Sequence, residues 1–406
     1  MAPSRGEAAA KHTAAQIPAR PLQCGERIVA DISPYYHHSV DQRDGAGSGD
    51  WLPRTLVILS GTKRGNAAAW NSLHVNLLQP ARADLMLVIS QVWLDQMQSN
   101  RSATFDADRA NLLNKAKFVV GVHEYDHWDE ALDEMEREGR SAHVGGEALP
   151  SWRIRLRALD CPNRGEALGG LVAGPTVQCR DMLALRSGSR FQGSAAIVGF
   201  YRWRAKRALQ ERRLIERYDA FVYTRVDIFF LCAWPTALPY WSSSAAPSGG
   251  GDGHPRVALI PQSRTVWDRN TGDPHDWGGL YDRFIVASRG AIGTALSTLE
   301  QWVVHDRPLS GVPSRPLHAN AEVALQAALA DGGVDVYRTP RRMLLVHAVA
   351  EANNGDRSRW STCTLQSAPP SLAAYGLCAK ACSEFVSAAY ACTADRNASL
   401  RRAIKV

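Results

Sequence analysis

The sequence predicts an α/β fold, a mostly parallel open sheet with helices on both faces. Two features indicate it. Apolar runs of strand length, such as TLVILS at 55–60 and DLMLVIS at 84–90, are typical of strands that are buried on both faces of a parallel sheet. Segments with helical spacing of apolar residues alternate with these runs. The 406 residues suffice for one large core or two medium-sized cores.

The first half of the pattern begins at residue 55. The strand 55–60 ends at Gly61, and the helix after it carries apolar residues at helical spacing until Pro80 stops it. Two further buried strands are predicted at 84–90 and 117–122. Strands that alternate with helices in this way favour a Rossmann-like open sheet.

The second half continues the alternation after a long helix at 194–218, which starts apolar and becomes strongly basic. The most strand-like segment of the chain, AFVYTRVDIFFL, follows it. The later predicted elements are strands at 282–288, 334–340 and 343–349, and helices at 289–304 and 320–333.

Three regions differ in composition. Residues 1–50 are rich in Ala, Gly and charge and read as a flexible N-terminal segment. Residues 51–360 are predicted to form a single domain, in which 140–190 lacks a sustained period and is interpreted as an inserted loop region. Residues 361–406 form a cysteine-containing C-terminal tail.

The charge balance favours anionic partners. The net charge is +7 and the pI is near 9.0, which suits nucleic acid, a phosphorylated small molecule or an acidic polymer. No RNA-binding signature and no paired-cysteine finger is visible, so nucleic acid is not the expected partner. The most apolar run, IFFLCAW at 228–234, is too short for an integral membrane span. The N-terminus lacks the apolar stretch of a signal peptide, which leaves a soluble, cytoplasmic protein as the default expectation.

Four of the eight cysteines crowd the last 45 residues, and three interpretations of them stay open. They are Cys363, Cys378, Cys382 and Cys392. They can be unpaired thiols, two disulfides or a zinc site, although no CxxC pair occurs. A possible glycan acceptor at Asn397 also keeps an oxidising compartment open.

The segment GVHEYDHWDE contains a His-Glu-x-x-His match at His123, Glu124 and His127, which on a helix is typical of zinc proteases. Here the preceding KFVVGV is predicted as a strand, and the nearest third-ligand candidate, Glu147, lies in a turn. A zinc metalloprotease is therefore kept only as a minor alternative. In an α/β sheet His123, Glu124 and Asp126 would lie on the ligand-binding rim at a strand end, or they are solvated loop charges that cap the following helix.

Another polar segment, SGTKRGN at 60–66, joins the first strand to the first helix. The segment starts at Ser60, its glycines, of which Gly61 is the first, permit tight backbone turns, and Lys63 and Arg64 place positive charge beside the positive end of the helix. This combination suits a diphosphate, although the segment is not a Walker loop.

Three acidic residues stand at other element ends. Arg225 and Asp227 point to the same side of an apolar strand, as a structural ion pair or as a ligand site. Asp282 follows a Gly-Gly pair at the start of a strand, and Glu322 lies in the first turn of a helix, where an acid is also favoured by the helix dipole.

The order of five motifs resembles a group of glycosyltransferase-like proteins from algae, their large viruses and other eukaryotes, which have the nucleotide-diphospho-sugar transferase (GT-A) fold. The motifs are SGTKRGNAAAWNSLHVNLLQPARADL, AKFVVGVHEYDHWDEALDEM, YDAFVYTRVDIFF, GGLYDRFIVASR and NAEVALQAAL. The resemblance runs over roughly 54–360. It implies that His-Glu-x-x-His is merely an acidic segment of the family.

The resemblance also implies a donor site. In that fold an Asp-x-Asp motif holds a divalent metal, Mn²⁺ or Mg²⁺, on the diphosphate of the sugar donor. Asp227 matches its last Asp, but Arg225 occupies the first position, and a guanidinium can neutralise diphosphate charge by itself. His347 is either an additional metal ligand or a buried structural histidine.

The predicted function is therefore transfer of a sugar from a nucleotide-diphosphate sugar to a hydroxyl of a glycan or other acceptor. An inverting reaction needs a carboxylate base, for which Asp282 is the first choice and Glu322 the second. The alternative is a non-catalytic nucleotide- or glycan-binding protein of the same fold, which the arginine at position 225 favours.

Overall fold

The computed structural model describes the chain in separate stretches. These are residues 54–62, 67–99, 112–125, 128–141, 151–152, 194–234, 254–261, 280–305, 321–348, 372, 377–379, 388–389 and 391–393. The predicted N-terminal segment and most of the predicted loop insertion lie outside them, as do Lys63 and Arg64. Among the helices in these stretches, none combines the length and apolar character needed to cross a membrane.

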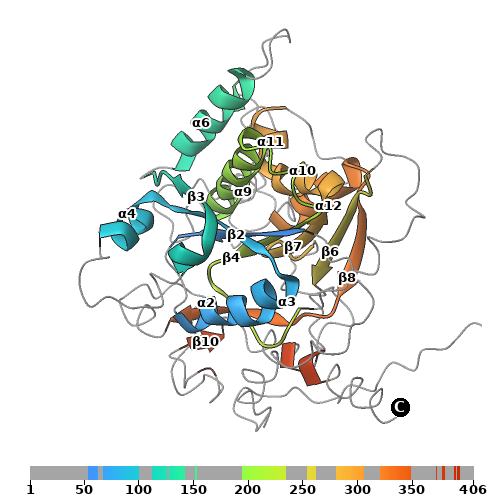
Figure 1. Ribbon diagram of the computed structural model, residues 1–406. Helices are drawn as coiled ribbons and strands as arrows, with labels where there is room; N and C mark the ends of the chain where they lie inside the picture. The colour runs from blue at the N-terminus through green and yellow to red at the C-terminus, as the bar shows by residue number, and fades with distance from the viewer. Residues whose placement is uncertain are drawn as a thin grey trace, which may run out of the picture.

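A seven-stranded sheet forms the centre of the molecule (Figure 1), with the strand order β3-β2-β1-β4-β7-β6-β8. The strands are β1 (Thr55–Gly61), β2 (Asp84–Ser90), β3 (Ala116–Val122), β4 (Ala220–Arg225), β6 (Val257–Pro261), β7 (Phe284–Ser288) and β8 (Asp335–Thr339). Only β7 runs antiparallel to its neighbours β4 and β6 within this sheet. The predicted α/β fold with a mostly parallel open sheet is confirmed.

Helices cover both faces of this sheet, which explains why its central strands are apolar without interruption. On one side lie α6 (Trp128–Ser141), α9 (Ser194–Glu211), α10 (Arg289–Leu296), α11 (Thr298–Val303) and α12 (Ala321–Asp331). On the other side lie α2 (Ala67–Leu73), the π-helical turn η1 (His74–Leu78) and α3 (Gln79–Ala81). The helix α4 (Gln91–Ser99) follows β2 directly.

A second, three-stranded antiparallel sheet has the order β10-β9-β5. Its strands are β5 (Ile228–Phe230), β9 (Met343–Ala348) and β10 (Leu377–Ala379). The sequence predicts one continuous strand over 220–231, and this is wrong, because β4 ends at Arg225 and the chain turns into the second sheet. The turn is held by two remote backbone groups: Val226 N donates to Ser60 O at 3.1 Å and Val346 N donates to Asp227 O at 2.9 Å.

Several predicted boundaries also shift. The long helix ends at Glu211 rather than 218, and Arg213 after it has a positive φ of 49°. The predicted helix 289–304 is two helices, α10 and α11, which are separated at Ser297. The helical run continues through a π-helical turn to Ala81, one residue beyond the predicted stop at Pro80, and Arg82 then adopts a left-handed conformation.

The described part of the C-terminal tail belongs to the same hydrophobic core as the sheet. Leu372, Leu377 and Ala388 are all buried in that core. Cys392 is also buried there and forms a disulfide with Cys232. The interpretation of the tail cysteines as unpaired thiols is therefore wrong for Cys392. Its disulfide partner, Cys232, lies outside the tail.

Candidate functional site at the carboxyl edge of the sheet

Predicted site residues from three strands meet at one edge of the main sheet. The parallel strands β1 and β4 both end there, with Ser60 paired to Arg225. The antiparallel β7 starts at the same edge, since Phe284 pairs with Thr224. Ligands of open α/β sheets bind outside the carboxyl ends of the strands. The local sequence thus delivers Arg225, Asp227 and Asp282 to the edge where a ligand is expected.

Arg225 and Asp227 form a bidentate ion pair. The distance from Arg225 Nε to Asp227 Oδ1 is 2.9 Å, and that from Nη2 to Oδ2 is 2.6 Å. The Asp227 side chain is only 2% exposed. Burial by itself lowers the pKa of Arg225, but the charge and hydrogen bonds of Asp227 outweigh it and raise the pKa above its ordinary value. The two side chains meet as expected, but not through alternation along one strand, because Asp227 lies in the turn after β4.

Asp282 is held by an arginine that sequence reasoning missed. Arg202 in α9 is 1% exposed, and its Nη2 donates to the main-chain oxygen of Asp282 and, at 3.3 Å, to the carboxylate Oδ2. The Arg202 guanidinium also lies 5.1 Å from the ring centre of Tyr223. Tyr223 in turn has its hydroxyl 3.3 Å from Ser60 Oγ. These contacts connect α9, β4 and the end of β1.

Arg283 joins the two carboxylates that are candidates for the base. Its Nε lies 4.0 Å from Asp282 Oδ1, and its Nη2 lies 3.6 Å from Glu322 Oε1. The backbone supports this arrangement, because Leu280 N donates to Glu322 O at 3.0 Å. The charges of Asp282 and Arg283 also reach Arg225, where the first raises the guanidinium pKa and the second lowers it. The charged residues therefore form one network.

We call this network the carboxyl-edge cluster. It contains three arginines and three carboxylates, all of them buried or mostly buried: Arg202, Arg225, Arg283, Asp227, Asp282 and Glu322. Tyr281 packs beside it, with the guanidiniums of Arg283 and Arg341 at 5.4 Å and 4.5 Å from its ring centre. Guanidinium groups that are fixed by stacking and ion pairs are suited to anionic ligands.

Arg202 was missed because it stands in a helix with many basic residues. Other basic side chains of that helix pair elsewhere: Arg204 with glutamates of α6, and Lys206 with Glu300 of α11. One signal in the sequence distinguishes Arg202, since it lies between the apolar Tyr201 and Trp203 in the apolar half of the helix. In this helix, the buried arginine is recognised by its position in the apolar half and not by its residue type.

The remaining predicted residues have mixed outcomes. Ser60 is buried at the edge, and Gly61 has a φ of 136°, so a side chain there would be strained and would approach Val226 Cγ2 to 3.2 Å. Lys63 and Arg64 lie outside the described residues, and of His347 only the backbone is described, paired with Cys378 in β10. Their roles stay predictions.

The His-Glu-x-x-His match does not lie on a helix. β3 ends at Val122, His123 and Glu124 follow in irregular backbone, and α6 begins only at Trp128. The exposed His123 ring packs edge-on against Tyr125, with the ring centres 4.7 Å apart. His123 and Glu124 therefore lack the helical geometry of a zinc protease site, and His127 lies outside the described residues, so the structure gives this minor alternative no support.

A metal centre built by protein ligands alone does not occur in the described stretches, where no three His, Cys, Asp or Glu side chains gather to hold an ion. Both oxygens of Asp227 are engaged by Arg225. The cluster as described does not fit a preformed metal site, and the assignment of Asp227 and His347 as metal ligands stays a prediction.

Comparisons with known proteins assign no family, and they include a distant structural likeness. No protein-family model matches the chain, and no curated protein matches it. Among solved structures, the crystal structure of mouse xyloside xylosyltransferase 1 in its apo form aligns over 71% of this chain and 84% of its own, with a TM-score of 0.32 and 11% sequence identity. At this distance the likeness assigns neither a family nor an activity to the chain.

Proposed function

We propose that this protein is a glycosyltransferase of the GT-A type, which transfers a sugar from a nucleotide-diphosphate donor to a hydroxyl acceptor. One observation carries the proposal: Arg225, Asp227, Asp282 and Glu322, from separate segments of the chain, belong to one buried charged network at the ligand-binding edge of an open α/β sheet. Buried charge is unfavourable for folding, so a cluster of this kind at a strand edge supports a site.

Arginine supplies the positive charge that a diphosphate leaving group requires. Arg225 lies 16% exposed at the end of β4, directly beside the turn that follows β1. A fixed guanidinium stabilises the charge that develops on the leaving phosphate. In this proposal Arg225 gives up one of its hydrogen bonds to Asp227 and donates to the diphosphate instead. The segment with Lys63 and Arg64 adds further positive charge.

A divalent ion is a separate part of the proposal. When bound with the donor, Mn²⁺ or Mg²⁺ would supply additional neutralisation of the diphosphate. Asp227 is the side chain of the cluster that would hold it, since it stands where the resemblance places the last Asp of the metal motif. Arg225 would have to release one of the two Asp227 oxygens first.

Asp282 is the proposed base because its backbone and carboxylate are both fixed by Arg202. A base that removes the proton of the acceptor hydroxyl works best when its carboxylate is held in a fixed orientation, even if little of it is exposed. Glu322 is the competing assignment, since the same Arg283 lies 3.6 Å from it.

A second candidate function is supported by the same ion pairs. Both oxygens of Asp227 are bonded to Arg225, and Asp282 and Glu322 are both buried beside Arg283. Carboxylates that are engaged in this way suit a binding protein that holds a nucleotide or glycan without catalysing a reaction. The two functions differ in turnover and not in nucleotide affinity.

The test combines turnover with binding. The full chain is screened for hydrolysis and transfer with UDP-, GDP- and dTDP-sugars, with and without Mn²⁺, and nucleotide affinity is measured by calorimetry. Arg225→Ala is expected to weaken diphosphate binding by about 10–100-fold, as for loss of a charged hydrogen bond, and to weaken monophosphate binding much less. Arg204→Ala, on the exposed side of α9, is the control.

Two outcomes decide between the alternatives. Nucleotide binding without turnover, for every donor tried, would favour the binding protein. Equal diphosphate affinity in the wild type, Arg225→Ala and Asp227→Asn would contradict the donor site altogether. A gain in affinity with Mn²⁺ that Asp227→Asn abolishes would identify Asp227 as a metal ligand.

A further inference from the structure

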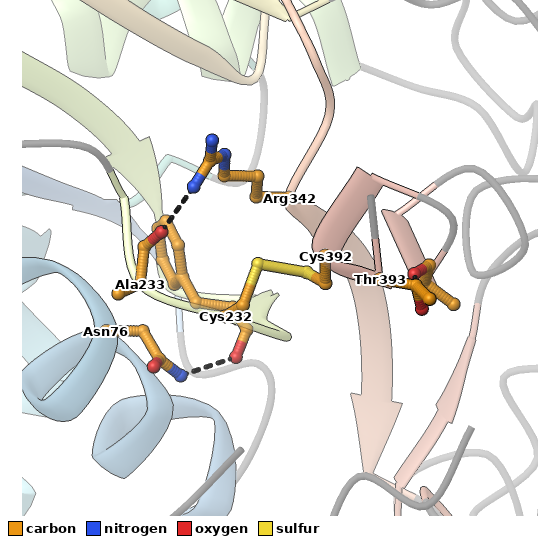
Figure 2. The surroundings of a disulfide bond; sticks show 8 residues. Asn76, Cys232, Ala233, Arg342, Cys392 and Thr393 are labelled. Atoms are coloured by element: carbon orange, nitrogen blue, oxygen red, sulfur yellow. Dashed lines mark hydrogen bonds between the residues drawn. A yellow bond between two sulfur atoms is a disulfide. The ribbon is translucent and has the colours of Figure 1, made fainter. Parts of the chain in front are cut away.

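The C-terminal segment is joined covalently to the chain just after Asp227. A disulfide connects Cys232, which follows β5, to Cys392, 160 positions further along the chain, with a Cα–Cα distance of 5.9 Å (Figure 2). Because Cys392 is buried in the main core, the cross-link ties the tail to the body of the protein rather than to itself.

β5 has only three residues, and segments that are remote in sequence hold it in place. The Phe230 N–H donates to Ser72 Oγ at 3.0 Å, and the Phe230 carbonyl accepts from Asn76 Nδ2 at 2.8 Å. Arg342, which precedes β9, donates through Nη1 to Ala233 O at 2.8 Å (Figure 2). The position of β5, and of the turn before it, therefore depends on the tertiary structure.

The disulfide links the segments that follow the two edge strands of the second sheet. β10 and β5 are its two edge strands, with β9 between them. The chain leaves β10, contributes the buried Ala388 to the core, and returns to the β5 side at Cys392. The central strand β9 contacts the candidate site directly, since Val346 N donates to Asp227 O at 2.9 Å. A release of the tail would therefore loosen the strand that supports Asp227.

We propose that the Cys232–Cys392 disulfide is a covalent clamp for the Arg225–Asp227 turn, and that formation of the donor site depends on its oxidation. This turn lies between β4 in the main sheet and β5 in the second sheet. Short strands with few contacts open locally more easily than the core does, and a cross-link restricts such opening. The link to nucleotide affinity rests on the proposed function, whereas the clamp itself does not.

The chemistry is a two-electron thiol–disulfide exchange. Each cysteine thiol loses one proton and one electron as the S–S bond forms, and a disulfide oxidant accepts both electrons and becomes two thiols. A dithiol reductant reverses the reaction: it gives two electrons and two protons to the cysteines and becomes a cyclic disulfide. The clamp is thus closed in an oxidising compartment and open in a reducing one. The oxidised disulfide requires an oxidising compartment, which conflicts with the cytoplasmic location that the sequence suggests by default.

The test uses the full chain, purified without reductant. Peptide mapping under non-reducing conditions is expected to recover the Cys232–Cys392 cross-linked peptides. Cys232→Ser and Cys392→Ser are expected to lower the melting temperature by about 5–10 °C and to raise hydrogen exchange in 226–234 by roughly tenfold or more. The matched control is the same pair of variants under reducing conditions, where the wild type also lacks the cross-link and should no longer differ from them.

Nucleotide binding provides the functional readout. Dithiothreitol is expected to weaken UDP affinity of the wild type by roughly tenfold and to leave that of Cys392→Ser, already weak, unchanged. Absence of the cross-linked peptides, or equal hydrogen exchange in the oxidised and reduced chains, would overturn the clamp. If no nucleotide binds even to the oxidised wild type, the proposed function fails, while the peptide map and the hydrogen exchange still decide whether the clamp exists.

Discussion

The two edges of the main sheet carry the same chemical groups in different surroundings. At the amino edge, Asp219 accepts from Arg54 at 3.3 Å and from Arg289 at 2.8 Å, and Lys117 pairs with Asp84 at 2.7 Å. The Arg54 and Lys117 side chains there are 64% and 49% exposed. In the carboxyl-edge cluster, by contrast, the Arg202 and Asp227 side chains are 1% and 2% exposed.

This difference supports the proposal that the functional site lies at the carboxyl edge. Exposed ion pairs contribute roughly 0–1 kcal/mol and need no further explanation. Buried pairs lose hydration that their attraction often does not recover, so apolar residues would commonly be at least as stable in their place. The charges of the carboxyl edge are therefore better explained by a ligand that needs them than by stability.

The largest effect is expected for catalysis at Asp282. Asp282→Asn should lower the transfer rate by about 10²–10⁴-fold, because a base contributes that much to rate while adding little ground-state binding. Nucleotide affinity, measured by calorimetry, should stay within a few-fold of the wild type. Glu322→Gln is the paired variant. Full activity of Asp282→Asn together with an inactive Glu322→Gln would exchange the roles of the two carboxylates.

The next effect separates buried from exposed charge within one helix. Arg202→Met should lower the free energy of unfolding by about 3–5 kcal/mol, because Asp282 would lose a buried partner. Arg204→Met removes only the partly exposed pairs of Arg204 with Glu134 and Glu138, so it should cost roughly 0–1 kcal/mol. Urea denaturation measures both. Equal losses would remove the distinction between the two environments.

Arg202 is also expected to position Asp282, and kinetics distinguish this role from a purely structural one. In the folded fraction of Arg202→Lys, the turnover number should fall while the KM for the donor changes little, because the carboxylate loses its direction but the donor contacts remain. A proportional loss of activity and folded protein, with an unchanged turnover number, would leave Arg202 with a structural role only.

The smallest effect concerns pH at the amino edge. Burial would raise the pKa of Asp219, but its hydrogen bonds to Arg54 and the charges of Arg54 and Arg289 lower it below the ordinary value of 3.8. A carboxylate with a lowered pKa adds stability that is present above pH 3.8 and is lost as the pH falls towards the folded-state pKa. Asp219→Asn should therefore change stability at pH 7 by roughly 1 kcal/mol or less.

The same variant should lose stability less steeply than the wild type when the pH falls from 5 to 3, which urea midpoints at several pH values would show. Parallel midpoints for the two proteins across this range would mean that the pairs of Asp219 contribute nothing measurable in the folded state.

Much of the fold is predictable from the sequence because its signals are local. The apolar runs of β1, β2 and β7 and the helical spacing between them depend on residues close together in the chain. The same holds for Arg225, Asp227, Asp282 and Glu322 as candidates, since polar residues at the ends of apolar strands stand out in any α/β pattern.

What the sequence by itself determined is therefore the α/β pattern and the polar residues at the ends of its strands. The tertiary structure alone decided that β4 and β5 are separate strands, since the turn between them is held by Ser60 and Val346. It also decided that Arg202 faces Asp282 and that Cys232 is the partner of Cys392. The physical reason is the same in each case: these contacts join segments that are remote in the chain, and no local period encodes which remote group satisfies a buried charge, thiol or backbone N–H.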